Sequence, residues 1–302
     1  MEREIYHIHT ISQLHEAQNL PKPIHPLISI VDVSQWVIEE KWIGVKTTAD
    51  LYSIALKDKS CGLMYGRHLY DFDEGVLIFT APRQVNGVTK AQKLNEINGW
   101  MLFFHPDLIR NTPLAGIIGN YKFFDYDVYE ALHLSATEQQ TITDCVTMIK
   151  NEISENIDSH SQTIIASSLE LMLNLSARYY ERQFITRKKN NSDVVIQIEK
   201  LLKEYFKSDE LNEKGLPAVK YLAAKVHLSP NYLSDLLRKE TGMNTQDHIH
   251  HYLIEEAKKI LLGTNKSISE IAYRLGFEYP QYFSKLFKQK TGNTPQEFRD
   301  MN

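Results

Sequence analysis

The sequence has few cysteines, no long apolar run and no strong excess of either charge. Cys61 and Cys145 are the only cysteines among 302 residues, and their wide separation excludes a disulfide scaffold or a Cys-x-x-Cys metal site. No segment approaches the roughly 18 apolar residues of a membrane-spanning helix. Residues 1–30 also lack the basic and apolar segments of a signal peptide. We therefore expect a cytoplasmic protein with no membrane partner.

The composition is that of an ordinary globular protein, with 42% hydrophobic and 24% charged residues. A chain of this length usually forms more than one domain. The net charge of −4 is unevenly divided. Residues 193–302 contain 16 Lys and Arg against 15 Asp and Glu, a net charge of +1, while residues 1–192 contain 18 against 23, a net charge of −5. This difference is too small to support or exclude nucleic acid as a partner.

A polar, basic stretch, TRKKNNSD, separates two regions of different character and predicts a linker. We place an N-terminal domain at 1–186, the linker at 187–192 and a C-terminal domain at 193–302, where Asp193 is expected to be the N-cap of the first helix. The resulting fold class is α+β and multidomain.

The first part of the N-terminal domain, about 27–104, has the pattern of short strands. Residues 52, 54 and 56 alternate with polar neighbours, and apolar runs follow at 76–79 and 100–104. Several short strands with turns between them predict a β-barrel or sandwich. Aromatic residues in this region, such as Tyr52, are more often core than pocket lining, so we assign no ligand-binding residues.

Two helices, at about 136–184, are expected to close the N-terminal domain. The first has one apolar stripe, formed by Ile142, Cys145, Val146, Ile149 and Ile153. The second has two stripes on different sides, formed by Ile165, Leu169, Met172 and Leu173 and by Ile164, Leu171 and Leu175. The second stripe either packs within the same domain or faces a second subunit.

The C-terminal domain contains a repeated segment. NYLSDLLRKETG begins at Asn231 and QYFSKLFKQKTG begins at Gln281. Each copy is preceded by a short helical pattern and a turn, so the two units extend over about 218–240 and 267–290. Gly276 in the second turn, and His227 at the matching place in the first, are expected to adopt positive φ. A further helix, about 245–262, joins the copies.

The second helix of each copy presents one polar face. Tyr232 and Tyr282 are expected on the opposite, buried side. A helix-turn-helix places such a face in the major groove of DNA. A solvated surface helix has the same pattern, and a solenoid would need three or more tandem copies. Because two capped copies share this face across a rigid spacer, we favour DNA. The candidate residues are Asn231, Ser234, Asp235, Arg238, Pro280, Gln281, Ser284, Lys285 and Lys288.

The segment IAYRLGFEYPQYFSKLFKQKTGNTPQEFR, together with Leu222-Ala223 and Tyr232-Leu233-Ser234, resembles the DNA-binding domain of the AraC/XylS family of bacterial transcription regulators. The resemblance covers the last third of the chain. It implies that residues 231, 234, 235, 280, 281 and 285 face bases and that Arg238 and Lys288 touch phosphate. Asp235 would accept a hydrogen bond from cytosine or be idle. The segment GNTPQEFR is expected to pack and cap.

The N-terminal domain resembles the family's cupin-like sensor domains around residues 74–82, with lower specificity. Metal-binding cupins cluster His and Glu ligands, whereas His25, His68 and His105 are widely separated and His7-Ile8-His9 is expected to be a frayed, solvated end. We expect no metal, cofactor or catalytic residue.

The resemblance implies a promoter-binding regulator with a small-molecule effector, RNA polymerase as a partner and a homodimeric state. A constitutive dimeric DNA-binding protein and a cupin-type enzyme fused to a DNA-binding domain are the alternatives.

Overall fold

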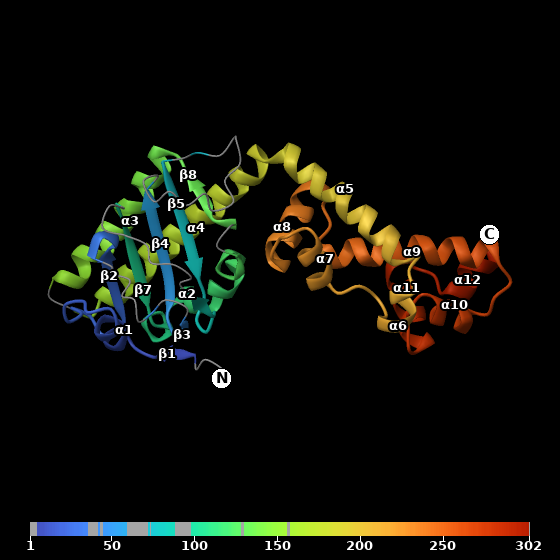
Figure 1. Ribbon diagram of the computed structural model, residues 1–302, viewed down its shortest axis with the longest axis horizontal. Coiled ribbons are helices and arrows are strands. Elements are labelled where there is room, and N and C mark those ends of the chain that lie inside the picture. Colours follow the sequence, from blue (N-terminus) through green and yellow to red (C-terminus); the bar gives the residue numbers. More distant parts are fainter. Residues whose placement is uncertain are drawn as a thin grey trace. The chain divides into compact units, whose positions relative to one another are not determined.

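The chain folds into two units, Met1–Arg187 and Lys188–Asn302 (Figure 1). The structure is a computed structural model and describes residues 5–35, 42, 45–58, 72, 74–87, 98–127, 130–155 and 158–301. Cys61 and His68 lie outside the described residues. Within the described part, no helix is long and apolar enough to cross a membrane.

The first unit is built on a five-stranded antiparallel sheet with the strand order β2-β7-β4-β5-β8. The strands predicted from alternation and from the two apolar runs are confirmed. The bounds are β2 (Ile28–Asp32), β4 (Tyr52–Asp58), β5 (Gly75–Thr80), β7 (Gly99–Phe104) and β8 (Leu132–Leu134).

The register of this sheet gathers its apolar side chains on one face. Ile54 is paired with Phe79 on one side and with Leu102 on the other, and all three are buried. Phe79 contacts the ring of Tyr180 on the following helices, so this face is the core of the unit. Tyr52 stacks on Phe104 at 4.9 Å between centroids and therefore packs in the core.

Helices α3 (Ala136–Ser154) and α4 (Ser161–Thr186) lie across that face (Figure 1). A capping box between Ser135 and Glu138 starts α3. The predicted stripe of α3 is buried throughout, including Cys145, whose thiol pKa is raised by burial. The core stripe of α4 is buried as well, whereas Ile164 and Leu171 of its second stripe are exposed.

A second sheet joins three short strands in the order β1-β3-β6. Their bounds are β1 (Tyr6–Ile8), β3 (Lys46–Ala49) and β6 (Asn86–Gly87), and α1 (Ile11–Ala17) follows β1. The expectation of a frayed end at His7-Ile8-His9 was wrong, because β1 pairs in parallel with β3 and Ile8 is buried. Asp50 follows β3. Its hydrogen bond with His9 is the main cause that lowers the pKa of Asp50 from 3.8 to about 2, and His7 and Arg83 act in the same direction.

The described strands form two open sheets, so the structure shows a mixed α/β unit and does not confirm the cupin-like barrel. Short helical turns and one more helix connect the strands. Their bounds are η1 (Val33–Gln35), η5 (Pro106–Leu108), α2 (Pro113–Ile117), η6 (Ile118–Asn120) and η7 (Lys122–Asp125).

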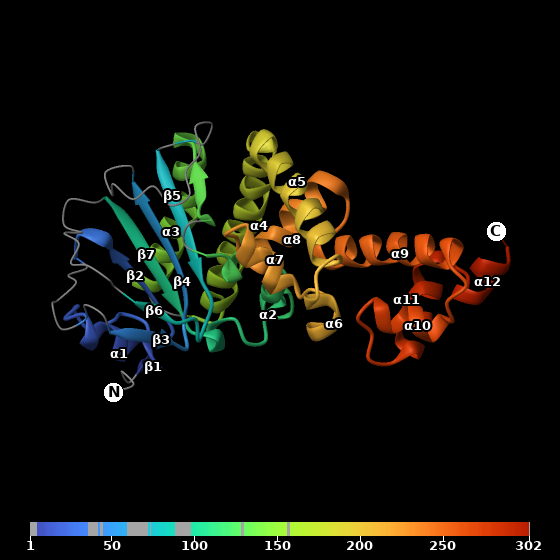
Figure 2. The ribbon, with the colours of Figure 1, turned by 45° about the vertical axis from the view of Figure 1, so that its right-hand side comes forward.

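The described part of the second unit is all helical. Its helices are α5 (Lys188–Tyr205), α6 (Glu210–Lys214), α7 (Val219–Lys225), α8 (Pro230–Thr241), α9 (Thr245–Gly263), α10 (Ile268–Arg274), α11 (Pro280–Thr291) and α12 (Pro295–Asp300). In both ribbon views α9 runs between the α7–α8 pair and the α10–α11 pair (Figure 1 and Figure 2).

The start of this unit differs from the prediction. Residues 188–192, expected in the linker, already belong to α5, and Asp193 lies inside this helix instead of capping it. The stretch contains no Pro or Gly that would prevent a helix. Asn191 is buried and its amide donates a 3.0 Å hydrogen bond to Glu240 on α8, so the polar stretch is partly packed.

Candidate nucleic-acid interface

The first helix-turn-helix consists of α7 and α8. The turn between them contains His227 at φ 56°, which confirms the predicted left-handed conformation. Ser229 caps α8 by accepting a hydrogen bond from the backbone N–H of Tyr232, and Gly242 ends the helix at φ 78°. The caps and the turn thus fix the length and the direction of α8.

The second helix-turn-helix consists of α10 and α11. Gly276 in its turn has φ 81°, and a Cβ there would lie 2.7 Å from the carbonyl oxygen of Leu211 on α6. Glycine is therefore required both for the backbone conformation and for the close approach of α6. A capping box between Ser267 and Glu270 starts α10, whereas Tyr279 gives α11 no side-chain cap.

The connecting helix α9 spans Thr245–Gly263 and is about 29 Å long at 1.5 Å per residue. Its apolar side contributes Leu253, Ala257 and Leu261 to a core that also contains Phe283 and Phe287 of α11. The helix is therefore part of the packing of the second copy and acts as a rigid spacer.

The second copy leaves its predicted polar face open. Gln281, Lys285 and Lys288 of α11 are exposed, while Pro280 and Ser284 are half-buried. At about 100° per residue, residues 281, 285 and 288 share one side of the helix. Among the described residues, Lys285 makes no ion pair, so its ammonium group is available to a ligand.

The first copy uses part of its polar face internally. Ser234 is half-buried and its hydroxyl lies 3.0 Å from the hydroxyl of buried Thr245. Asp235 forms an ion pair with Arg238 at 3.2 Å, one turn along α8. Asn231 is half-buried at the start of the helix. The structure thus brings the four predicted residues onto α8, but two of them are already paired with each other.

One residue was placed on the wrong side by the sequence prediction. Tyr282 was expected to be buried like its counterpart Tyr232, yet it is 61% exposed while Tyr232 is 3% exposed. It adjoins Gln281 and Lys285 on α11 and contacts Tyr279 edge to face at 5.8 Å. The sequence offers one signal of this difference between the copies. A long helix, α5, comes before the first copy and packs against α8.

The C-terminal segment GNTPQEFR packs against the core of the second copy and caps a helix, as predicted. Thr294 and Glu297 form a capping box at α12, and Phe298 packs edge to face on Phe287. The guanidinium of Arg299 donates to the carbonyl oxygens of Leu261 and Lys266. These contacts hold the end of α9 against α12.

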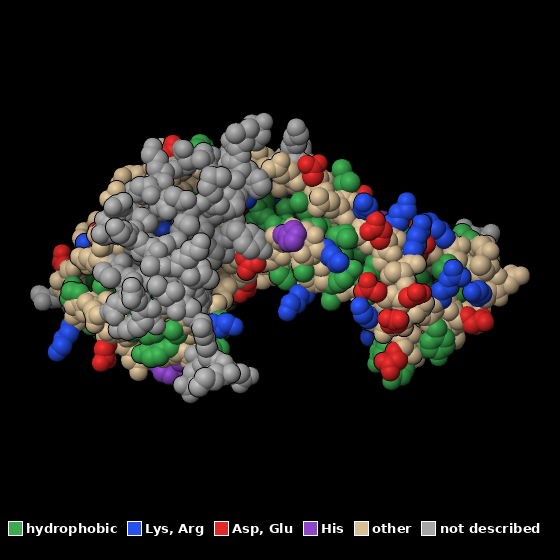
Figure 3. All heavy atoms as spheres, in the orientation of Figure 1, with side chains coloured by type: hydrophobic (Ala, Val, Ile, Leu, Met, Phe, Trp, Pro, Cys, Tyr) green, Lys and Arg blue, Asp and Glu red, His purple; other side chains and the backbone are tan. Residues whose placement is uncertain are grey.

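Charges of both signs alternate over the second unit. On the face drawn in Figure 3 its Lys and Arg side chains lie among Asp and Glu, in keeping with the small net charge of +1 over residues 193–302. Lys290 on α11 pairs with Asp247 on α9 at 2.9 Å, and this hydrogen bond lowers the pKa of Asp247. Any attraction for DNA must therefore come from local groups such as those on α11.

Within the described part of the first unit, a surface pocket of about 240 Å³ is lined in part by His25, Glu152 and Asp158. This volume is below the range of about 300–1,000 Å³ for small-molecule sites. His25 accepts a hydrogen bond from the N–H of Leu27 and His105 accepts one from the N–H of Asp107, so both histidines stabilise local turns.

Residues 222–301, which contain both copies, match a family model described as a helix-turn-helix domain. The chain is 40% identical over 81 residues to the bifunctional transcriptional activator/DNA repair enzyme AdaA of Bacillus subtilis, which covers 27% of this chain and 38% of that protein. It is 35% identical over 78 residues to the uncharacterized transcriptional regulator YijO of Escherichia coli, covering 26% and 28%. The chain therefore spans about a third of the length of these relatives.

Among solved structures, the C-terminal domain of the two-component response regulator yesN from Fusobacterium nucleatum is 30% identical; the likeness covers 35% of this chain and 98% of that one, with a TM-score of 0.32. The C-terminal domain is thus a helix-turn-helix domain of the AraC type, the kind that its sequence predicts, and the match is confined to this part of the chain. The relatives are named as transcriptional regulators, and the match to AdaA covers only 38% of that bifunctional protein.

Proposed function

We propose that this protein is a sequence-specific regulator that reads a promoter with α8 and α11 and is controlled by a small-molecule effector in its first unit. The observation that carries the proposal is the exposed polar face of α11, repeated in modified form on α8. The 29 Å length of α9 is near the 34 Å or so that separates successive major-groove segments on one side of DNA. We propose a cytoplasmic location, where the chromosome lies.

The base contacts are assigned by residue type. Gln281 and Asn231 suit adenine, and Lys285 suits guanine or phosphate. Pro280 can offer only an apolar contact, and Ser284 a single hydroxyl. Lys288 and Arg238 lie one turn further along each helix, where phosphates are more accessible.

The DNA-binding proposal is tested by selecting a binding sequence from random duplexes and measuring affinity at fixed salt. Lys285→Ala should lose about 1–3 kcal/mol, roughly 5-fold to 150-fold in affinity. Lys214→Ala is a matched control, because Lys214 is exposed on α6 and paired with Glu210. Equal affinity of the Lys285→Ala variant and the parent protein would remove α11 from the interface.

The minimal binding fragment should begin at Lys188, because α5 starts there and Asn191 bonds to α8. We expect the 188–302 fragment to bind the selected duplex. A fragment starting at Asp193 should be less stable, because it lacks this contact. A folded 188–302 fragment without affinity for DNA would contradict a separable DNA-binding domain.

A homodimer is proposed from the exposed stripe of α4, where Ile164 is 43% and Leu171 is 47% exposed. Burying such a stripe in a second copy removes apolar surface from water. Leu171→Lys should shift the protein to monomer in analytical ultracentrifugation, whereas Thr163→Lys, off the stripe, should not.

The effector proposal is supported by buried apolar side chains on the second face of the sheet, since Val31, Val76 and Met101 are also buried on the side turned away from α3 and α4. We further propose that the first unit is a cupin-like barrel, that the protein contacts RNA polymerase and that it has no enzymatic activity. A small molecule carried through purification and detected by native mass spectrometry would support effector control over a constitutive dimer. A protein that carries no small molecule and still binds its promoter with full affinity would favour a constitutive dimeric DNA-binding protein.

A further inference from the structure

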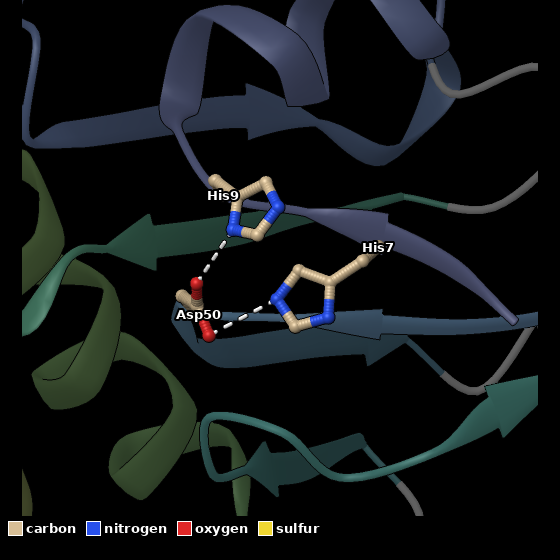
Figure 4. A group of neighbouring side chains, drawn as sticks. All are labelled: His7, His9 and Asp50. Carbon is tan, nitrogen blue, oxygen red and sulfur yellow. Dashed lines mark hydrogen bonds and ion pairs between the residues drawn. The ribbon is translucent and has the colours of Figure 1, made fainter.

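Three side chains with metal-binding donor atoms meet at the edge of the small sheet (Figure 4). Nε2 of His7 lies 3.1 Å from Oδ1 of Asp50, and Nδ1 of His9 lies 2.9 Å from Oδ2. The two imidazole rings stack with centroids 4.2 Å apart. All three donor atoms lie within 4.8 Å of one another.

The backbone explains why these side chains converge. In a strand, residues two apart point to the same side, so His7 and His9 share one side while Ile8 enters the core formed with Ile11, Leu14 and Leu51. The parallel register pairs Ile8 with Ala49, which places Asp50 directly after that pair. The N–H of Asp50 donates to the carbonyl oxygen of Ile8 at 2.9 Å, and the N–H of His9 donates to Gln13 at 2.8 Å.

The donor set fits a divalent transition metal. Zinc binds imidazole nitrogen and carboxylate oxygen at about 2.0–2.2 Å, so donors around a tetrahedral ion lie about 3.3 Å apart. The His–Asp separations are within a few tenths of an ångström of that value. The side chain of His9 is 59% exposed, which leaves water access to the remaining coordination positions.

A second observation distinguishes this cluster from an ordinary ion pair. Nε2 of His7 is shielded from solvent, and its 3.1 Å contact with Oδ1 of Asp50 lacks the geometry of a hydrogen bond. The hydroxyl of Thr48, opposite His7 on β3, is also buried without a described partner. A buried polar atom without a well-aligned partner costs free energy, because it has lost its hydrogen bonds to water. Binding a metal through the His7 nitrogen would remove this cost.

We propose that His7, His9 and Asp50 form a binding site for a divalent transition-metal ion of the zinc type. The ion joins the β1 strand to the turn after β3. Nε of Arg83 lies 3.4 Å from Oδ1 of Asp50, but its side chain is 82% exposed and moves aside when the ion binds. The imidazoles bind as neutral ligands.

The test is calorimetric titration of the EDTA-treated full-length protein with Zn²⁺, with Co²⁺ absorption as a reporter of nitrogen and oxygen ligation. We expect one ion per chain. His9→Gln should weaken the affinity at least about 10-fold, since even outer-shell changes cost that much. His9 is exposed enough for this variant to fold, which circular dichroism would check, and His7→Gln should behave likewise.

The control is His251→Gln on α9, because Asp247 and His251 are four residues apart and could chelate a metal on the helix surface. This variant should keep the parent's affinity and Co²⁺ spectrum. Absence of saturable binding, unchanged affinity in His9→Gln, or loss of binding in His251→Gln would each overturn the proposal.

Discussion

The two helix-turn-helix copies have the same turns and C-caps but differ in what covers the flank of the second helix. In the first copy α5 packs against α8, and Tyr232 is 3% exposed. In the second copy α11 packs mainly against α10 and α12, and Tyr282 is 61% exposed. The comparison teaches that a repeated sequence specifies the inside of a motif, whereas burial at its edge depends on helices outside the repeat.

The polar faces differ as well. On α8 the charges of Asp235 and Arg238 cancel in an ion pair, while on α11 Lys285 and Lys288 give the face two positive charges. Each phosphate neutralised by a basic side chain adds to salt-dependent affinity. We therefore expect the second copy to supply most of the electrostatic attraction for DNA.

The largest expected effect separates the two tyrosines. Tyr232→Ala should destabilise the 188–302 fragment by about 3–5 kcal/mol, because Tyr232 is buried and its truncation leaves a cavity in the core. Tyr282→Ala should change the free energy of unfolding by about 0.5 kcal/mol or less. Urea denaturation of both variants measures the difference. Similar losses in the two variants would mean that Tyr282 is also covered.

A smaller effect is expected at Ser234 and Ser284, which occupy matching positions in the two copies. Ser234→Ala leaves the buried hydroxyl of Thr245 without this partner and should cost about 1–3 kcal/mol. Ser284→Ala should be nearly neutral, because the residue matching Thr245 in the second copy is Pro295, which has no hydroxyl. The same denaturation experiment compares them, and a neutral Ser234→Ala would show that the hydrogen bond contributes little.

The ion pair on α8 can be broken without changing its shape. Asp235→Asn removes the charge that holds Arg238, so the guanidinium can reach a phosphate. The slope of log affinity against log salt should become steeper by about one unit. Fluorescence anisotropy on non-specific duplex DNA measures the slope. An unchanged slope would place Arg238 away from the DNA backbone.

The smallest effect concerns pH. His248 near the start of α9 is buried, and its Nε2 lies 2.7 Å from the hydroxyl of Thr241. Burial lowers the pKa of His248 from 6.5. Phe298 occupies the matching place in the second copy. Because the folded protein favours neutral His248, its contribution to stability is complete above pH 6.5 or so and is lost as pH falls toward the lowered pKa.

His248→Phe should therefore reduce the loss of stability of the 188–302 fragment between pH 7.5 and pH 5.5 or so. The remaining loss is expected from His250, whose pKa burial also lowers. Melting temperatures of the variant and the parent fragment across that pH interval measure the loss of stability. A variant as pH-sensitive as the parent would assign the effect to His250 or another group.

Much of the second unit could be predicted from its residues. The positive φ at His227 and Gly276, the cap at Ser229 and the C-caps at Gly242 and Gly292 all follow from local backbone chemistry. The start of α5 could not, because its polar first turn is stabilised by the distant contact from Asn191 to Glu240. The convergence of His7, His9 and Asp50 was also missed, since a parallel pairing of β1 with β3 leaves no local signal.

The sequence by itself determined the repeated motif, its caps and the identity of the residues on each polar face, because these depend on spacing and on the chemistry of neighbouring residues. Only the tertiary structure decided which of those residues remain exposed. Tyr232 and Tyr282 occupy matched positions, yet one is buried and the other is exposed. Burial is a property of the surrounding elements, and these are brought together by contacts between residues far apart in the chain.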